Sequence, residues 1–153
     1  HYGEWYEVER SANNYMGSDR CHKLMWGKPV NNVSEVTNKS ILKSSNIPLS
    51  ITSHATLNDE GYVFTHHFPT LGDISMQYYA LDFVPDDYAI IWSCEPRGNK
   101  HIEKAWVYSR NITLPHNIDA LKREAFQRYN LPMPKMIRHD HSDCDEVFSS
   151  FNF

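Results

Sequence analysis

The sequence lacks several features that would assign it to common functional classes. No stretch approaches the roughly 18 apolar residues that a membrane-spanning helix needs, so stable membrane insertion is not expected. No run of lysine or arginine suggests a nucleic-acid-binding surface, and the net charge is only −4. The N-terminus also lacks an apolar leader, so we expect any secretory signal to have been removed or to lie outside this sequence.

Motifs of common enzymes are missing as well. The sequence contains neither a G-x-S-x-G elbow nor a glycine-rich phosphate loop, and its Ser, His and Asp residues show no order that implies a catalytic triad. An isomerase of a lipid or carotenoid would need a base or nucleophile in its pocket, which only a free, inward-facing Cys94 would supply. We therefore expect no enzymatic activity.

Cysteines and glycosylation sequons point to the secretory pathway. The cysteines are Cys21, Cys94 and Cys144. The N-x-S/T sequons begin at Asn32, Asn38 and Asn111. Three sequons in so short a chain, together with a plausible disulfide, favour a secreted glycoprotein.

Short segments rich in β-branched and aromatic residues recur along most of the chain. We expect strands at residues 5–10, 22–30, 35–41, 49–57, 62–68, 75–83, 88–94 and 104–111. Turn-forming residues lie at 58–61, 69–73, 85–87 and 96–99. Glycine and proline at 27–29 indicate that the second segment ends early or bends. This spacing predicts an all-β protein, which is either an up-and-down barrel or a sandwich.

One helix is expected after the last strand, over residues 116–128. Its apolar residues Ile118, Leu121, Ala125 and Phe126 have the spacing of a single buried stripe. Prolines precede this segment and follow it, which limits the helix at both ends. We expect this helix to pack outside the sheet. With no repeat, low-complexity tract or linker, residues 1–153 are expected to form a single domain.

Three local motifs follow one another in order along the chain. Residues 3–7 read GEWYE, residues 87–94 read DYAIIWSC, and residues 105–111 read AWVYSRN before Leu114-Pro115 and the expected helix. Together they resemble the lipocalin family, in the branch of apolipoprotein D and the insect bilin-binding, insecticyanin-like proteins. The resemblance covers nearly the whole chain. It implies an eight-stranded antiparallel up-and-down β-barrel with one C-terminal α-helix packed outside.

The sequence departs from the family pattern in two places. Residues 83–88 read FVPDDY where the family usually has Thr-Asp-Tyr, so the loop at the closed end is expected to differ in shape. The family's segment before G-x-W, which carries a further cysteine, is missing, and we expect that it was cleaved, is disordered or was not included in the sequence. The resemblance implies a Cys21–Cys144 disulfide and would pair Cys94 with the missing cysteine. Without that partner, Cys94 is a free thiol.

The resemblance also implies how one end of the barrel is closed. Trp5 and Arg110 match the family's pair in which the guanidinium lies over the indole face, a contact worth roughly 0.5–2 kcal/mol. Alternatively, Arg110 is a surface cation near a sequon.

Aromatic residues are the expected lining of a ligand cavity. The candidate ligand-binding residues are Trp26, His54, Phe64, His66, Tyr78, Trp106 and Tyr108. Trp106 and Tyr108 alternate with the closing arginine and so share its inward face, and Trp26 and Trp106 match pocket positions of the branch. The strand registers, and with them the direction of the others, stay open. Alternatively, these aromatics fill the barrel as ordinary core.

These observations favour an extracellular carrier of a small hydrophobic ligand. The resemblance implies either a bilin such as biliverdin or a lipid such as a fatty acid, sterol or retinoid. The tryptophans and tyrosines favour a bilin, because flat pyrrole rings stack on aromatic side chains. Its propionates would need cations or donors at the mouth, for which Lys39, Lys43, His54 and Arg97 are candidates. The alternative is a secreted interaction or storage protein with a filled barrel, and a homo-oligomer is left open.

Histidines near the C-terminus raise the question of a metal site. Residues 139–145 read HDHSDCD, and His66-His67 adds a second pair. We expect this tail to be a solvated, flexible stretch, and a disulfide-bonded Cys144 would not be a thiolate ligand. No functional metal site is therefore expected.

Overall fold

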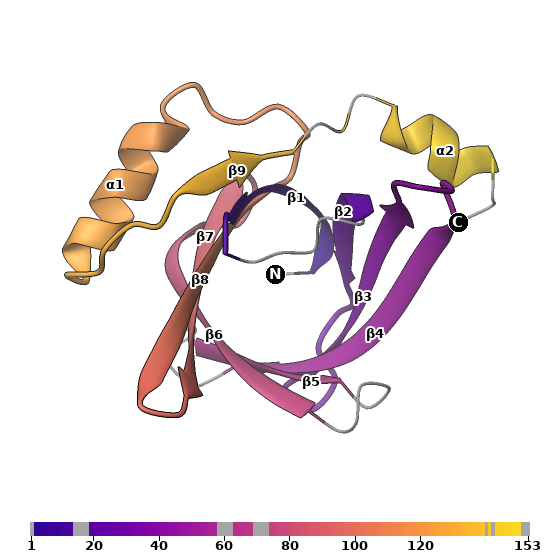
Figure 1. Cartoon of the computed structure of the whole chain (residues 1–153). Coiled ribbons are helices and arrows are strands. Elements are labelled where there is room, and N and C mark those ends of the chain that lie inside the picture. Colours follow the sequence, from indigo (N-terminus) through magenta and orange to yellow (C-terminus); the bar gives the residue numbers. More distant parts are fainter. Residues whose placement is uncertain are drawn as a thin grey trace.

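Eight antiparallel strands close into a barrel in the computed structural model (Figure 1), which describes residues 2–13, 19–57, 63–68, 74–139, 141 and 143–150. The strands are β1 (Gly3–Ser11), β2 (Asp19–Trp26), β3 (Val33–Leu42), β4 (Pro48–Leu57), β5 (Val63–Phe68), β6 (Ile74–Val84), β7 (Tyr88–Arg97) and β8 (Lys100–Ser109). Each strand pairs with the next, and β1 pairs with both β2 and β8. The predicted up-and-down barrel is confirmed, and the sandwich is excluded.

Several strands end at residues other than those predicted, and these differences lie next to turns. The second strand ends at Trp26, as the glycine and proline at 27–29 indicated, and the chain then turns through Asn31 and Asn32, which both have positive φ. Strands β7 and β8 are longer than predicted. Only Gly98 (φ +62°) and Asn99 connect them, so the expected turn at 96–99 is shorter. The turns expected at 58–61 and 69–73 lie outside the described residues.

A β-bulge in β1 changes which side chains face the interior. The pairing with β8 shifts by one residue between Glu7 and Glu9. Strict alternation would place residues 5, 7 and 9 on one face, but the bulge turns Glu9 outward and Arg10 inward. Glu9 is buried outside the barrel wall, where Lys122 and Arg138 donate to its carboxylate at 2.6 and 2.7 Å.

Helix α1 (Ile118–Arg128) packs outside the barrel, as predicted. Ile118, Ala125 and Phe126 are buried against outward-facing strand residues that include Val8 and Val107. Burial of these apolar side chains fixes the helix on the barrel wall. No helix in the described part of the chain is long and apolar enough to cross a bilayer.

The expectation of a flexible C-terminal tail is wrong for its described residues, 136–139, 141 and 143–150. Strand β9 (Met136–Arg138) pairs with the end of β1, and helix α2 (Cys144–Ser150) lies beside the β2–β3 side of the barrel (Figure 1). Between them, His141 is buried and its Nε2 donates to the carbonyl oxygen of Glu7 at 2.8 Å. Strand pairing and a disulfide hold this segment against the barrel, and neither is visible in its local composition.

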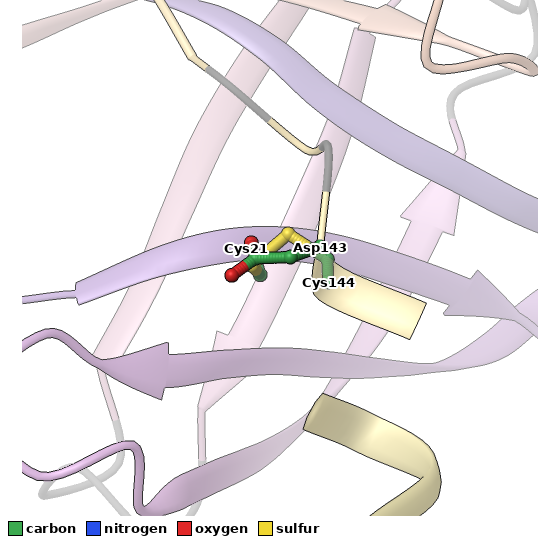
Figure 2. A group of neighbouring side chains, drawn as sticks. All are labelled: Cys21, Asp143 and Cys144. Carbon is green, nitrogen blue, oxygen red and sulfur yellow. A yellow bond between two sulfur atoms is a disulfide. The ribbon is translucent and has the colours of Figure 1, made fainter. Parts of the chain in front are cut away.

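The Cys21–Cys144 disulfide is confirmed (Figure 2). It joins β2 to α2 across 123 residues of sequence. Asp143 lies beside the two sulfur atoms and accepts a hydrogen bond from Arg20 at 2.7 Å. Because the sulfurs are bonded to each other, this group offers no thiolate to a metal ion. Asp143 and Cys144, near the end of the HDHSDCD segment, therefore form a structural connection to β2.

Candidate ligand-binding cavity

The barrel encloses a cavity of about 350 Å³. This volume lies within the usual range for small-molecule sites, roughly 300–1,000 Å³. Six of the seven expected ligand-binding residues line it, namely Trp26, Phe64, His66, Tyr78, Trp106 and Tyr108. These aromatic side chains surround an open space and do not fill the barrel completely.

Aromatic rings form a continuous wall on one side of the cavity. Phe64 and Tyr78 are stacked with ring centroids 5.8 Å apart, and Tyr78 meets Trp106 edge-on at 5.4 Å. The rings of Trp26 and His66 also meet edge-on, at 5.3 Å. Such offset and T-shaped contacts stabilise the wall and leave ring faces and edges toward the cavity.

His66 is a neutral member of this wall. Its Nδ1 lies 3.1 Å from the Ser53 hydroxyl oxygen, and burial lowers the pKa of the ring to about 4. Removal of the imidazole from water disfavours its charged form. At neutral pH the ring therefore takes part in polar contacts without adding charge to the cavity.

His54, the seventh expected residue, does not line the cavity, which corrects that expectation. It is exposed on the outer face of β4, while its neighbours Ser53 and Ala55 are buried on the inner face. Successive side chains of a strand point to opposite faces, so a shift of one residue decides whether a side chain lies inside or outside the barrel.

The cations suggested for the mouth are also outside the cavity. Lys43 and Arg97 are exposed near hairpin turns, and neither they nor Lys39 belong to the lining. The lining contains Arg10 and Lys104 instead. The position of Lys104 follows from its alternation with Trp106. The position of Arg10 depends on the bulge in β1, which nothing in the sequence predicted.

A buried ion pair reaches the cavity from β1. Arg10 Nε donates to Glu7 Oε2 at 3.0 Å, and Nη2 donates to the same oxygen. Both side chains are more than nine-tenths buried. Tyr108 pairs with Glu7 across the strands, and burial together with the Glu7 charge raises the tyrosine pKa well above its usual value. The cavity therefore combines apolar rings with a small set of strong polar groups.

Arg110 closes the end of the barrel where β1 begins. Its guanidinium carbon lies 3.8 Å from the Trp5 ring centroid, so the expected cation–π contact is present. Nη1 donates to the carbonyl of Glu4 and Nη2 to that of Tyr2, both at 2.9 Å, while Nε donates to Pro85 at 2.8 Å. These contacts tie β1 to the β6–β7 turn and to the end of β8.

Cys94 is a free thiol on the exposed face of β7. Because its side chain points outward, it supplies no nucleophile to the cavity.

The side chain of Asn38, which begins one of the three sequons, points inward: it lines the cavity, and its Nδ2 donates to the Ile51 carbonyl at 3.5 Å. A glycan on Asn38 would have to occupy the cavity, whereas Asn32 and Asn111 are exposed.

The sequence model of one protein family, the lipocalin / cytosolic fatty-acid binding protein family, matches residues 2–143 of this chain. The chain belongs to this family. This lipocalin therefore has the fold with which the family holds one small ligand inside a β-barrel. No curated protein matches the chain significantly.

Several solved structures resemble this one over most of its length. Insecticyanin from the tobacco hornworm Manduca sexta has a TM-score of 0.76 and 15% identity, with 94% of this chain and 79% of that chain covered. Lobster apocrustacyanin A1 has a TM-score of 0.74 and 16% identity, covering 90% and 76%. The cockroach allergen Per a 4 has a TM-score of 0.73 and 21% identity, covering 95% and 88%. At these identities the similarity establishes the fold alone.

Proposed function

We propose that this lipocalin is a secreted carrier that holds a bilin-type chromophore inside its barrel. The observation that carries the proposal is the aromatic wall beside the cavity, formed by Trp26, Phe64, His66, Tyr78 and Trp106. Flat conjugated rings stack on such side chains and gain area burial as well as specific ring contacts. The resemblance of the sequence motifs to the insect bilin-binding branch supports the same ligand class.

The second candidate is a lipid carrier, for a fatty acid, a sterol or a retinoid. The part of the lining near Trp5 favours it, because Leu24, Phe83 and Ile91 offer an apolar surface. A cavity of about 350 Å³ also lies toward the small end of ligand sites, which suits a slender lipid. In both cases binding, and not catalysis, is the proposed activity.

Secretion is proposed from chemistry that suits an oxidising compartment. The Cys21–Cys144 disulfide persists where thiols are not kept reduced. The exposed sequons at Asn32 and Asn111 are the proposed glycosylation sites. Mass spectrometry of tryptic peptides from the native protein, before and after removal of N-glycans, would check both sites.

The ligand class is tested by an absorption spectrum of the protein purified natively from its source. A bilin gives strong bands in the red and near-ultraviolet, and mass spectrometry of an organic extract then identifies it. A colourless protein that yields a fatty acid, sterol or retinoid would replace the bilin by the lipid. An empty extract would contradict the carrier proposal and favour a secreted interaction protein.

A further inference from the structure

Hydrogen-bond donors gather on the part of the cavity wall formed by β1 and β8. Arg10 and Trp106 are direct cross-strand partners, and both line the cavity. Lys104 lies two residues before Trp106 on the same strand and also lines the cavity. Two cationic side chains and an indole from adjacent strands therefore line the same space.

The protein's own acceptors leave hydrogen-bonding capacity on these donors. Arg10 binds Glu7 through Nε and Nη2, and among the described residues its Nη1 has no acceptor. The nearest carboxylate to Lys104 Nζ is that of Glu95 at 3.8 Å, which is too long for a hydrogen bond. The indole Nε1–H of Trp106, which also lines the cavity, can donate one hydrogen bond to an acceptor there. Polar groups that face a cavity need such partners, so these donors are available to a ligand.

The two cationic donors, Arg10 and Lys104, lie away from the apolar end of the cavity. Strand β1 runs from Gly3, beside the Arg110 closure, to Ser11, and Arg10 is near its far end. Strand β8 runs in the opposite direction, so Lys104 is also distant from Arg110. The cavity is thus amphipathic along its length.

The charge of the donors selects the kind of acceptor. Arg10 and Lys104 are cations, and charge-assisted hydrogen bonds to anionic oxygen are roughly twice as strong as neutral ones. Glu7 offsets part of the Arg10 charge, but the Lys104–Glu95 contact is long and both of its side chains are partly exposed. A carboxylate would use the free Arg10 nitrogen, the lysine and the indole N–H together.

We propose that Arg10, Lys104 and Trp106 form a subsite for a carboxylate of the ligand. It holds the acidic end of the ligand at the far end of the barrel and directs the apolar body toward Trp5. This inference rests on the proposed carrier function and adds the chemical group that the cavity selects. Bilin propionates and fatty acids share this group.

The test compares each acid with its neutral ester. The probes are cis-parinaric acid and its methyl ester, measured by polyene fluorescence, and biliverdin and its dimethyl ester, measured by absorption. We expect the acid of at least one pair to bind roughly 10-fold more tightly than its ester. The pair that shows the preference distinguishes the two sources of the carboxylate.

Variants then assign the preference to the subsite. Lys104→Met is expected to reduce the acid-over-ester ratio about threefold or more, because it removes a charge-assisted contact that only the acid can make. The double variant Glu7→Gln/Arg10→Gln removes the buried ion pair without leaving a single buried charge, and should reduce the ratio similarly. Lys100→Met is the matched control, because Lys100 is exposed on the same strand and outside the lining.

The outcomes separate the subsite from the carrier function. Ester affinity and the circular dichroism spectrum of each variant report whether the barrel is intact. Equal affinity of acid and ester in the wild-type protein, or a ratio that no cavity variant changes, would overturn the subsite and leave the carrier proposal standing. If neither member of either pair binds, the carrier proposal and the subsite both fail.

Discussion

Gly3 lies directly against Arg110: a β-carbon on Gly3 would be 2.9 Å from Arg110 Nη1. Gly3 also has φ +104°, a conformation that L side chains rarely adopt. The glycine of the G-x-W motif therefore serves the closure of the barrel end. It gives the guanidinium room to lie over Trp5 and to reach the carbonyls of Tyr2 and Glu4.

Gly3→Ala should destabilise the protein by about 2–3 kcal/mol, since it adds backbone strain and displaces Arg110. Urea unfolding followed by tryptophan fluorescence measures the change in the free energy of unfolding. Gly98→Ala is the control: Gly98 has φ +62°, in the left-handed region, and open space where its β-carbon would lie, so it reports the cost of a left-handed backbone without a steric clash. If both variants lost the same free energy of unfolding, the close contact between Gly3 and Arg110 would contribute nothing to stability.

Trp106→Ala should weaken binding of both the acid and the ester of the preferred probe by about 10-fold or more. The substitution removes a large ring from the cavity wall and its edge contact with Tyr78. Titration with biliverdin or cis-parinaric acid provides the affinities. Trp92→Ala is the control, because Trp92 packs outside the barrel wall, and it should lower stability without this loss of affinity. Unchanged affinity in Trp106→Ala would show that Trp106 is not part of the ligand-binding wall.

Stability should fall as the pH decreases from about 6.5 toward 4, in part through His66. Burial lowers the folded-state pKa of His66 to about 4, below the value of 6.5 expected in the unfolded chain. Between these values the unfolded state binds the proton and the folded state does not, so stability is fully present above pH 6.5 and is lost on acidification. The loss is about 1.4 kcal/mol per pH unit in this window, or roughly 3 kcal/mol in total.

His66→Gln should flatten this part of the pH profile, measured as the free energy of unfolding at pH 4.5, 5.5 and 6.5. His54→Gln, on the outer face of the adjacent strand, is the matched control and should keep the wild-type slope. Burial also lowers the pKa of His139 to about 4, so part of the slope should persist in His66→Gln. A profile as steep as that of the wild type would show that His66 is not neutral in the folded state.

Loss of the disulfide should cost about 2–5 kcal/mol of stability, because Cys21–Cys144 closes a loop of more than a hundred residues. The double variant Cys21→Ser/Cys144→Ser tests this in urea unfolding experiments. Cys94→Ser, which removes an exposed free thiol, should change stability by less than about 0.5 kcal/mol. A double variant as stable as Cys94→Ser would mean that β9 and the buried His141 hold the tail without the covalent link.

Much of the fold was predictable because its signals are local. Segments rich in β-branched and aromatic residues marked the strands, and the apolar stripe marked α1 to within two residues of its start. The tail was misjudged for the opposite reason. Its histidines and aspartates resemble a solvated segment, but Cys144 bonds to Cys21 and β9 pairs with β1, both of which are distant in sequence.

The amino-acid sequence by itself determined the family, the eight strands, the outer helix and the aromatic character of the cavity. These depend on residue types and on spacing within a few positions. Only the tertiary structure decided which side chains reach the ligand, because a single shift of register moves a side chain through the barrel wall. One such step left His54 outside, and the bulge after Glu7 brought Arg10 inside.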